Sequence, residues 1–234
     1  MTSRATSELR TFLLQNCDGL RAVAGSLAAA APIAAAPAAG AAESAGGTVV
    51  GRIVMVVSPN SGDGRTISTA CLGWALATVG DTVMVDAHLR KPELGTFFCA
   101  PDGAGLLNVL RDGLDFERAV HSTGTERLMI LPSGRNETHG ASGSSYLLSD
   151  NFARLINDLR HQWKYILIDT PPLLTDADAL LMTQHADDII LVLMANRTSW
   201  AVARDAAERL ERAGGRLKGV VLNRQRSLVR RPRL

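Results

Sequence analysis

Residues 58–67 read Ser-Pro-Asn-Ser-Gly-Asp-Gly-Arg-Thr-Ile, and this stretch decides how the rest of the chain is interpreted. An apolar run at 53–57 precedes it and predicts a buried strand, while an Ala/Leu-rich stretch without proline at 66–79 predicts a helix. Glycines between a strand and a helix let the backbone approach an anion, and the amides at the helix start point at it. The sequence therefore predicts a phosphate-binding loop, with Thr66 placed to offer its hydroxyl to a magnesium ion.

The bulk composition limits the classes of protein to consider. The chain has 234 residues, enough for one α/β domain with an appendage. Hydrophobic residues make up 46% and aromatic residues only 4%, so we expect an aliphatic core, and a net charge of +2 does not indicate a nucleic-acid partner. Arginines crowd the C-terminal end, at Arg224, Arg226, Arg230, Arg231 and Arg233. Such a cluster is either a solvated tail or a contact for anionic lipid headgroups.

The cysteines and the hydropathy pattern indicate in which cellular compartment the protein is expected. Cys17, Cys71 and Cys99 are far apart and form no Cys-x-x-Cys pair, which favours reduced thiols in a cytosolic protein. The candidate for a membrane span, 27–42, is mostly alanine and is interrupted by prolines. Charged residues shortly before it do not suit a signal peptide. We therefore expect a cytoplasmic protein, and a membrane partner stays open.

Four segments are predicted along the chain. Residues 1–21 form a short amphipathic segment, with apolar side chains at near-helical spacing. Residues 22–48 are dominated by Ala, Gly, Pro and Ser, which predicts a linker with little fixed structure. Residues 49–224 form the phosphate-loop domain, and residues 225–234 form a basic tail.

Apolar strands and helical segments alternate through this domain. The expected strands are 52–58, 82–87, 127–131, 165–169, 188–194 and 217–222. The expected helices are 66–79, 105–111, 150–161, 176–184 and 199–213. Continuous apolar strands in regular alternation with helices predict an α/β fold, a doubly wound and mostly parallel sheet with helices on both faces. Ligands of such sheets bind at the carboxyl ends of the strands.

Two further strands end in a carboxylate. The stretch 83–92 reads Val-Met-Val-Asp-Ala-His-Leu-Arg-Lys-Pro, with Asp86 at the strand end. An acid there either holds a magnesium-bound water or accepts a proton from an attacking hydroxyl, and the alternative is a turn cap or a pair with Arg90. The stretch 166–172, Ile-Leu-Ile-Asp-Thr-Pro-Pro, puts Asp169 at another strand end, the Walker B arrangement that orients Mg²⁺. Three such motifs in order indicate a nucleotide site.

These motifs resemble those of the bacterial tyrosine kinases of capsule and exopolysaccharide operons, in the deviant-Walker P-loop ATPase group. The resemblance extends over about residues 51–224 and includes Leu-Arg-Lys-Pro at 89–92 and Gly-Val-Val-Leu-Asn-Arg at 219–224. It implies a P-loop fold, ATP and Mg²⁺ as cofactors, and transfer of the γ-phosphoryl group to tyrosine. It also implies a membrane polysaccharide co-polymerase as the partner, which would bring the protein to the inner face of the plasma membrane.

The resemblance assigns roles to individual residues. The nucleotide contacts it implies are Gly62, Asp63, Gly64, Arg65, Thr66, Ile67, Asn223 and Arg224, the last two near the adenine. In the catalytic set, Arg65 would steady the phosphates, Asp86 would accept the hydroxyl proton and Asp169 would hold the metal. The implied metal ligands are Thr66, Asp86 and Asp169.

Several positions depart from the family's pattern. Arg65 stands where the family has lysine, and the planar fork of arginine is bulkier and tracks a transferring group less well. His88 replaces the second acid of the Walker A′ strand, and the chain lacks a closing tyrosine cluster, its tyrosines being Tyr146 and Tyr165. Of the family's Glu-x-x-Arg-x-x-Arg assembly motif only Arg10 remains, so a homo-oligomer stays open.

Three functions are compatible with these residues. The first is an ATP-binding, tyrosine-kinase-like regulator of exopolysaccharide or capsule biosynthesis and export, with weak or lost phosphotransfer. The second is a partitioning or positioning ATPase of the ParA/MinD kind, although Asn60 stands where those proteins have a second lysine. The third is a catalytically silent adaptor of the export complex, which Arg65, His88 and the absent tyrosine cluster favour.

Overall fold

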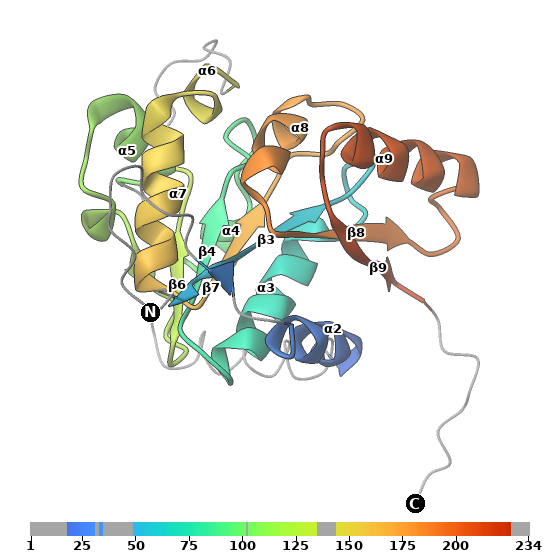
Figure 1. Cartoon of the computed structure of the whole chain (residues 1–234), viewed down its shortest axis with the longest axis horizontal. Helices are drawn as coiled ribbons and strands as arrows, with labels where there is room; N and C mark the ends of the chain where they lie inside the picture. Colours follow the sequence, from blue (N-terminus) through green and yellow to red (C-terminus); the bar gives the residue numbers. More distant parts are fainter. Residues whose placement is uncertain (1–17, 31–32, 35–48, 102, 135–143, 226–234) are drawn as a thin grey trace, which may run out of the picture.

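The computed structural model describes residues 18–30, 33–34, 49–101, 103–134 and 144–225 of the chain. Within them a twisted sheet forms the centre of the molecule, and helices pack on both of its faces (Figure 1). The sheet has seven strands in the order β5-β6-β4-β7-β3-β8-β9, and all neighbouring pairs are parallel except the antiparallel pair β5–β6. The predicted doubly wound α/β fold is confirmed.

The strands of the sheet are β3 (Arg52–Val57), β4 (Thr82–Asp86), β5 (His121–Ser122), β6 (Leu128–Leu131), β7 (Tyr165–Asp169), β8 (Asp188–Met194) and β9 (Leu217–Asn223). A separate two-stranded pair joins β1 (Ile33–Ala34) to β2 (Val49–Val50). The helices are α2 (Asp18–Ala28), α3 (Arg65–Ala77), α4 (Leu94–Phe97), α5 (Leu106–Asp112), α6 (Ser144–Leu147), α7 (Asp150–Gln162), α8 (Asp178–Met182) and α9 (Trp200–Arg212). Short 3-10 turns lie at Phe116–Arg118 and Thr183–His185.

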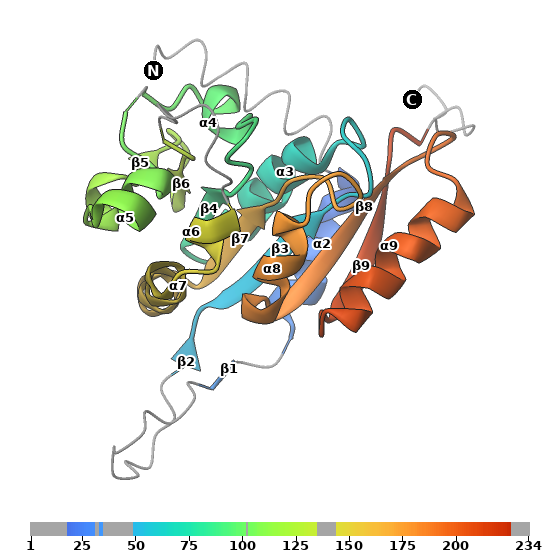
Figure 2. The same ribbon diagram turned by 90° about the horizontal axis from the view of Figure 1, so that it is seen from above.

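Each face of the sheet has its own aliphatic core because successive strand residues point to opposite faces. Along β3, Ile53 and Met55 pack with α5, α7, α8 and α9, whereas Val54 and Val56 pack with α2, α3 and α4. Figure 2 shows these two layers of helices from above. Burial of both faces explains why the strands read as continuous apolar runs.

Helix α2 crosses the boundary that the sequence placed between an amphipathic segment and a linker. Leu20, Ala24 and Leu27 are buried against α3, and the guanidinium of Arg21 lies 5.4 Å from the centre of the Trp74 ring. The expected linker is therefore wrong for its first residues, because a stripe of alanine and leucine at helical spacing covers one face of α3. Residues 1–17, 31–32, 35–48 and 226–234 lie outside the described part of the chain.

The cysteines depart from the expectation of reduced thiols. Cys71, which is buried in α3, is disulfide-bonded, whereas Cys99 is free and exposed. The expectation rested on the cysteines being far apart in the sequence. The packing of α2 on α3 brings distant parts of the chain together, so this separation did not exclude a disulfide. None of the helices in the described ranges combines the length and the apolar character needed to cross a membrane.

Candidate functional site

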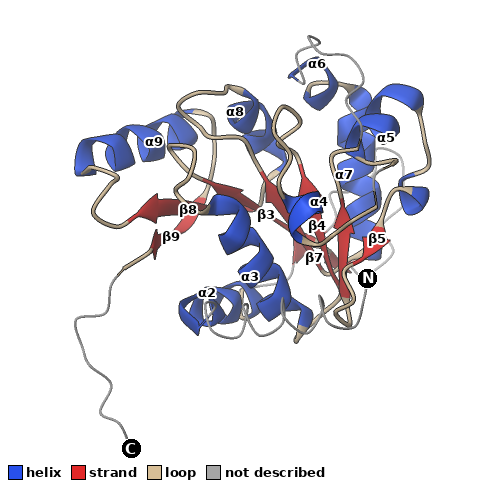
Figure 3. Cartoon of the chain, turned by 180° about the vertical axis from the view of Figure 1, so that it is seen from behind, coloured by secondary structure: helices blue, strands red, loops and turns tan. Residues whose placement is uncertain are grey.

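The three motifs meet at one edge of the sheet. The loop at 58–64 follows β3, Asp86 ends β4, and Asp169 ends β7. These strands are neighbours in the order β4-β7-β3, and Asp86 and Asp169 are register partners. Figure 3 shows the loop entering α3 beside the carboxyl ends of these strands. The structure therefore brings together the predicted site residues of all three motifs.

The loop takes the shape of an anion cradle. Gly64 caps α3 in the left-handed conformation, with φ +96°, and Gly62 has φ +82°. Asp63 is fully buried and braces the loop from within, because its carboxylate accepts from the Asn60 amide at 3.1 Å and from Thr198 Oγ1 at 3.3 Å. The Asp63 side chain thus supports the loop rather than facing a ligand.

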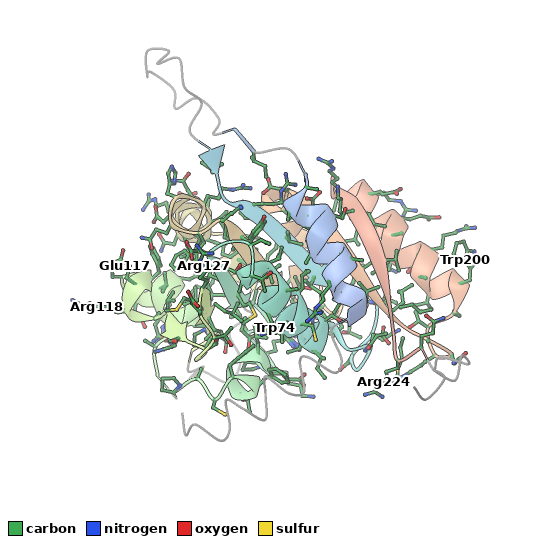
Figure 4. The ribbon with its side chains drawn as sticks, turned by 90° about the horizontal axis from the view of Figure 1, so that it is seen from below. Trp74, Glu117, Arg118, Arg127, Trp200 and Arg224 are labelled. Atoms are coloured by element: carbon green, nitrogen blue, oxygen red, sulfur yellow. The ribbon has the colours of Figure 1, made fainter. Side chains whose placement is uncertain are left out.

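The last strand of the sheet returns to this loop. Asn223 Nδ2 donates to the backbone oxygen of Asp63 at 2.9 Å, and it lies 1.8 Å from the position of a Cβ on Gly64. Arg224 is exposed next to it, at the rim of the molecule (Figure 4), and Ile67 is partly exposed in the first turn of α3. The structure therefore places Asn223 against the loop, and its contact with the adenine stays a prediction.

The Arg65 side chain turns inward instead of extending along the loop. Its Nε donates to Asp169 Oδ1 at 2.8 Å, and Nη1 lies 3.5 Å from Ser58 Oγ. Its Nη2 lies 3.4 Å from Nδ1 of His88, and only 6% of Arg65 is exposed. The guanidinium thus connects all three motifs of the site.

Asp169 is a buried carboxylate with several donors around it. Thr69 Oγ1 lies 3.3 Å from its Oδ1, and the Thr66 side chain is a further hydrogen-bond partner. Burial raises the pKa of Asp169, whereas the Arg65 charge and the threonine donors oppose that rise. The partnership with Thr66 links the phosphate loop to the Walker B strand.

Asp86 is fully buried and its two oxygens face backbone amides. Oδ2 accepts from Leu94 at 3.0 Å and from Gly95 at 3.4 Å, and Oδ1 accepts from the amide of His88 at 3.2 Å. Burial and then the nearby Asp169 charge raise the pKa of Asp86 from 3.8 to about 7, against the effect of these amides. Asp86 therefore holds the turn after β4, and the alternative pairing with Arg90 is not formed, since Arg90 pairs with Asp176.

The raised pKa of Asp86 predicts a pH-dependent stability. The folded chain keeps this proton up to about pH 7, whereas the unfolded chain loses it near the ordinary value of 3.8. Between these values the unfolded state binds fewer protons, so the free energy of unfolding should fall as the pH rises, by at most about 4 kcal/mol. Urea denaturation at about pH 5 and about pH 8 measures the fall, and Asp86→Asn should flatten it. Equal pH profiles for the variant and the unmodified chain would contradict the assignment.

The residues expected to bind magnesium do not fit that ion in this arrangement. Mg²⁺ requires a near-octahedral set of oxygen ligands. Asp169 Oδ1 already accepts from Arg65, and both oxygens of Asp86 accept from amides. The third expected ligand, Thr66, is already a hydrogen-bond partner of Asp169. At the neighbouring His88, burial and the Arg65 charge lower the pKa to about 4, so its imidazole is neutral. Across the described ranges, His, Cys, Asp and Glu side chains form no cluster of three or more that suits a metal.

Several contributors to the site escaped the sequence reasoning. Thr198 braces Asp63 from the loop after β8, and Ser58 and Thr69 contact Arg65 and Asp169 through their hydroxyls. Arg197 Nη1 lies 3.3 Å from the position of a Cβ on Gly62. The position of residues 197–198 just after β8 was a usable signal, because the parallel strands of this sheet all end at the same edge.

Sequence comparison identifies relatives over most of the domain. The family model described as cellulose biosynthesis protein BcsQ matches residues 52–212. The chain is similar to tyrosine-protein kinase CpsD of Streptococcus agalactiae serotype III (strain NEM316), with 30% identity over 175 residues, 74% of this chain and 74% of the relative. CpsD of Streptococcus pneumoniae serotype 4 (strain ATCC BAA-334 / TIGR4) is 31% identical over 175 residues, 74% of this chain and 76% of the relative.

Solved structures give the same grouping. The kinase domain of VpsO has a TM-score of 0.70 and 33% identity, over 75% of this chain and 86% of that one. The chimerical protein CapA2B2 has a TM-score of 0.70 and 30% identity, over 76% and 77% of the two chains. The septum site-determining protein MinD of Pyrococcus horikoshii OT3, complexed with Mg-ADP, has a TM-score of 0.63 and 27% identity, over 74% and 70%. The chain therefore belongs to the P-loop protein family of BcsQ and the CpsD/CapB-like bacterial tyrosine kinases.

Proposed function

We propose that the protein is an ATP-binding, tyrosine-kinase-like regulator of exopolysaccharide or capsule biosynthesis with weak phosphotransfer. The observation that carries the proposal is the Arg65 guanidinium, paired with Asp169 inside an otherwise complete phosphate loop. A loop of this shape retains its anion cradle, whereas the Arg65 cation is fixed on Asp169 and cannot follow a transferring group. Nucleotide binding is inferred from the backbone of the loop, and slow chemistry from the contact between Arg65 and Asp169.

ATP binding is supported by the backbone of the loop. Left-handed Gly62 and Gly64 precede the start of α3, where free amides and the helix dipole attract phosphate. We assign the phosphates to 62–67 and the adenine to Asn223 and Arg224. The similar MinD structure was solved with Mg-ADP, which supports a nucleotide in the corresponding place.

Weak phosphotransfer is supported by the state of the three catalytic candidates. Arg65 pairs with Asp169, and the oxygens of Asp86 are held by amides instead of facing an open site. The described tyrosines are poor acceptors as well, because Tyr165 is 3% exposed and Tyr146 packs against the core. Phosphotransfer to a tyrosine hydroxyl would need a free base and a cation that follows the phosphoryl group. Asp86 is held by backbone amides and Arg65 is held by Asp169, so neither residue is free for that role.

We further propose a cytoplasmic location at the inner face of the membrane, through a membrane co-polymerase of the polysaccharide export system. The likeness to the chimerical protein CapA2B2 supports such a partner. A positioning ATPase of the MinD kind is less well supported. Asn60 bonds to Asp63 within its own loop, where a second lysine would be needed.

Phosphotyrosine formation tests the proposal. Purified protein and S. agalactiae CpsD would be incubated with ATP, and phosphotyrosine measured on each chain and on an added tyrosine polymer. We expect at least about 100-fold less product than with CpsD, the effect of one misplaced electrostatic group. The variant Arg65→Lys/His88→Asp should raise the product about tenfold, since lysine reaches along the loop instead of forking onto Asp169.

Three outcomes would contradict parts of the proposal. Product at the CpsD rate would show that phosphotransfer is intact. Absence of ATP binding by calorimetry, in the unmodified chain and in the double variant, would leave only a silent adaptor. Cooperative, ATP-dependent binding to DNA or to vesicles without a partner would favour the positioning ATPase.

A further inference from the structure

The Arg65 guanidinium occupies the interior of the site, where it reaches groups from every motif. Its Nε lies 2.8 Å from Asp169 Oδ1, a distance of a charge-assisted hydrogen bond between two buried groups. The contacts of Nη1 with Ser58 Oγ at 3.5 Å and of Nη2 with His88 Nδ1 at 3.4 Å are longer. One edge of the guanidinium is thus committed to Asp169, and its two terminal nitrogens remain only weakly bonded.

The weakly bonded nitrogens match the geometry of a phosphate. Two parallel N–H donors of a guanidinium bind two oxygens of one phosphoryl group, which a lysine cannot do. The contacts with Ser58 and His88 are long, so charged phosphate oxygens can displace these partners from Nη1 and Nη2. Arg65 can therefore hold Asp169 and a polyphosphate at the same time.

Magnesium would have to displace this arrangement. An ion on Asp169 Oδ1 would compete with Nε of Arg65 and with Thr69 Oγ1 for the same oxygen. An ion on Asp86 would compete with the amides of Leu94 and Gly95, which are fixed by the backbone. His88 supplies an imidazole nitrogen where Mg²⁺ prefers oxygen ligands.

We propose that Arg65 takes the place of the magnesium ion, so that the site binds a nucleoside polyphosphate in its metal-free form. The guanidinium is a fixed cation between Asp169 and the phosphates, the place where a divalent ion would otherwise bridge the two. This inference rests on the proposed nucleotide binding and specifies the form of the ligand.

Calorimetric titration with ADP, in buffer containing magnesium and in buffer containing EDTA, tests the inference on the full chain. We expect the two dissociation constants to differ by less than about fivefold, a difference of about 1 kcal/mol in binding free energy. A larger loss of affinity in EDTA would overturn the inference while leaving nucleotide binding in place. Absence of binding in both buffers would overturn the proposed function and this inference with it.

A variant pair assigns the effect to Arg65. The variant Arg65→Lys/His88→Asp removes the guanidinium of Arg65 and adds a carboxylate that can bind magnesium. Its ADP affinity should therefore be about tenfold or more higher in magnesium than in EDTA. Arg90→Lys is the matched control, because the Arg90 side chain is 60% exposed and pairs with Asp176, not with a residue of the phosphate loop. It should keep the metal independence of the unmodified chain. A double variant that is folded by circular dichroism and still binds ADP equally in EDTA would contradict the role of Arg65.

Discussion

Gly64→Ala is expected to weaken nucleotide binding by about 100-fold, measured by calorimetry with ADP. A Cβ at this position would lie 1.8 Å from Asn223 Nδ2 and 3.0 Å from its Cγ. The Asn223 side chain would have to rotate away and lose its 2.9 Å hydrogen bond to Asp63. The backbone at φ +96° adds strain for any residue with a Cβ, and the two costs together are about 3 kcal/mol.

Gly113→Ala is the matched control for this variant. Gly113 has φ +67°, but a Cβ there would meet nothing within 4 Å. It should lose about 1 kcal/mol of stability and leave the ADP affinity unchanged. Gly64→Ala/Asn223→Ala should regain part of the free energy of unfolding that Gly64→Ala loses, because it removes the clash. It should not regain the ADP affinity, because the hydrogen bond to Asp63 and the proposed adenine contact are still missing. If Gly64→Ala binds ADP as tightly as the control, the loop is not the nucleotide site.

Arg160→Met is expected to lower the free energy of unfolding by about 3 kcal/mol. Arg160 lies in α7 and forms a two-pronged pair with Asp187, at 2.8 Å from each terminal nitrogen. It also donates to the backbone oxygen of Gly51 at 2.8 Å and of His185 at 3.2 Å. Methionine keeps the apolar stem but leaves Asp187, which is 18% exposed, without its cation.

Urea denaturation measures this loss, and the melting temperature should fall by roughly 6–12 °C for a domain of this size. Arg209→Met is the control, because Arg209 pairs with Asp205 at 3.0 Å with both side chains 43% exposed. Exposed pairs of this kind contribute at most about 0.5 kcal/mol. Equal losses in the two variants would show that the Arg160 network does not hold α7 to the start of β3.

The sheet could be predicted because its strands are buried on both faces. The strand expected at 165–169 is β7 (Tyr165–Asp169) to the residue, and the one expected at 52–58 is β3 (Arg52–Val57). Helix α7 begins at Asp150 as expected, where the Ser149 side chain accepts from the backbone N–H of Phe152. In these places local sequence and tertiary burial favour the same structure.

Other elements carry no local signal. Strand β5 (His121–Ser122) exists only through its antiparallel pairing with β6, and a two-residue strand has no periodicity to detect. The helix expected at 176–184 begins later, as α8 (Asp178–Met182), and tightens into a 3-10 turn. Helix α2 was hidden by its alanine content, which in the adjoining residues indicated a linker. Its packing against α3 decides its structure.

The location of the candidate site followed from the sequence, but its internal contacts did not. Parallel strands place their carboxyl ends together, so Asp86, Asp169 and the loop had to share an edge. The partner of Arg65 is 104 residues away, and the amides that hold Asp86 come from the start of α4. Side-chain direction and backbone closure of this kind depend on the folded chain, and residue type alone does not specify them.

The contact between Asn223 and Asp63 determines when, during synthesis of the chain, the loop becomes braced. The loop is translated early, yet the side chain that props it belongs to the last strand of the domain, 160 residues later. A growing polypeptide on the ribosome therefore carries an unbraced cradle until its final strand has emerged and joined β8. A nascent chain stopped before residue 223 lacks this brace, so the proposed nucleotide binding would report completion of the domain and would not template its early folding.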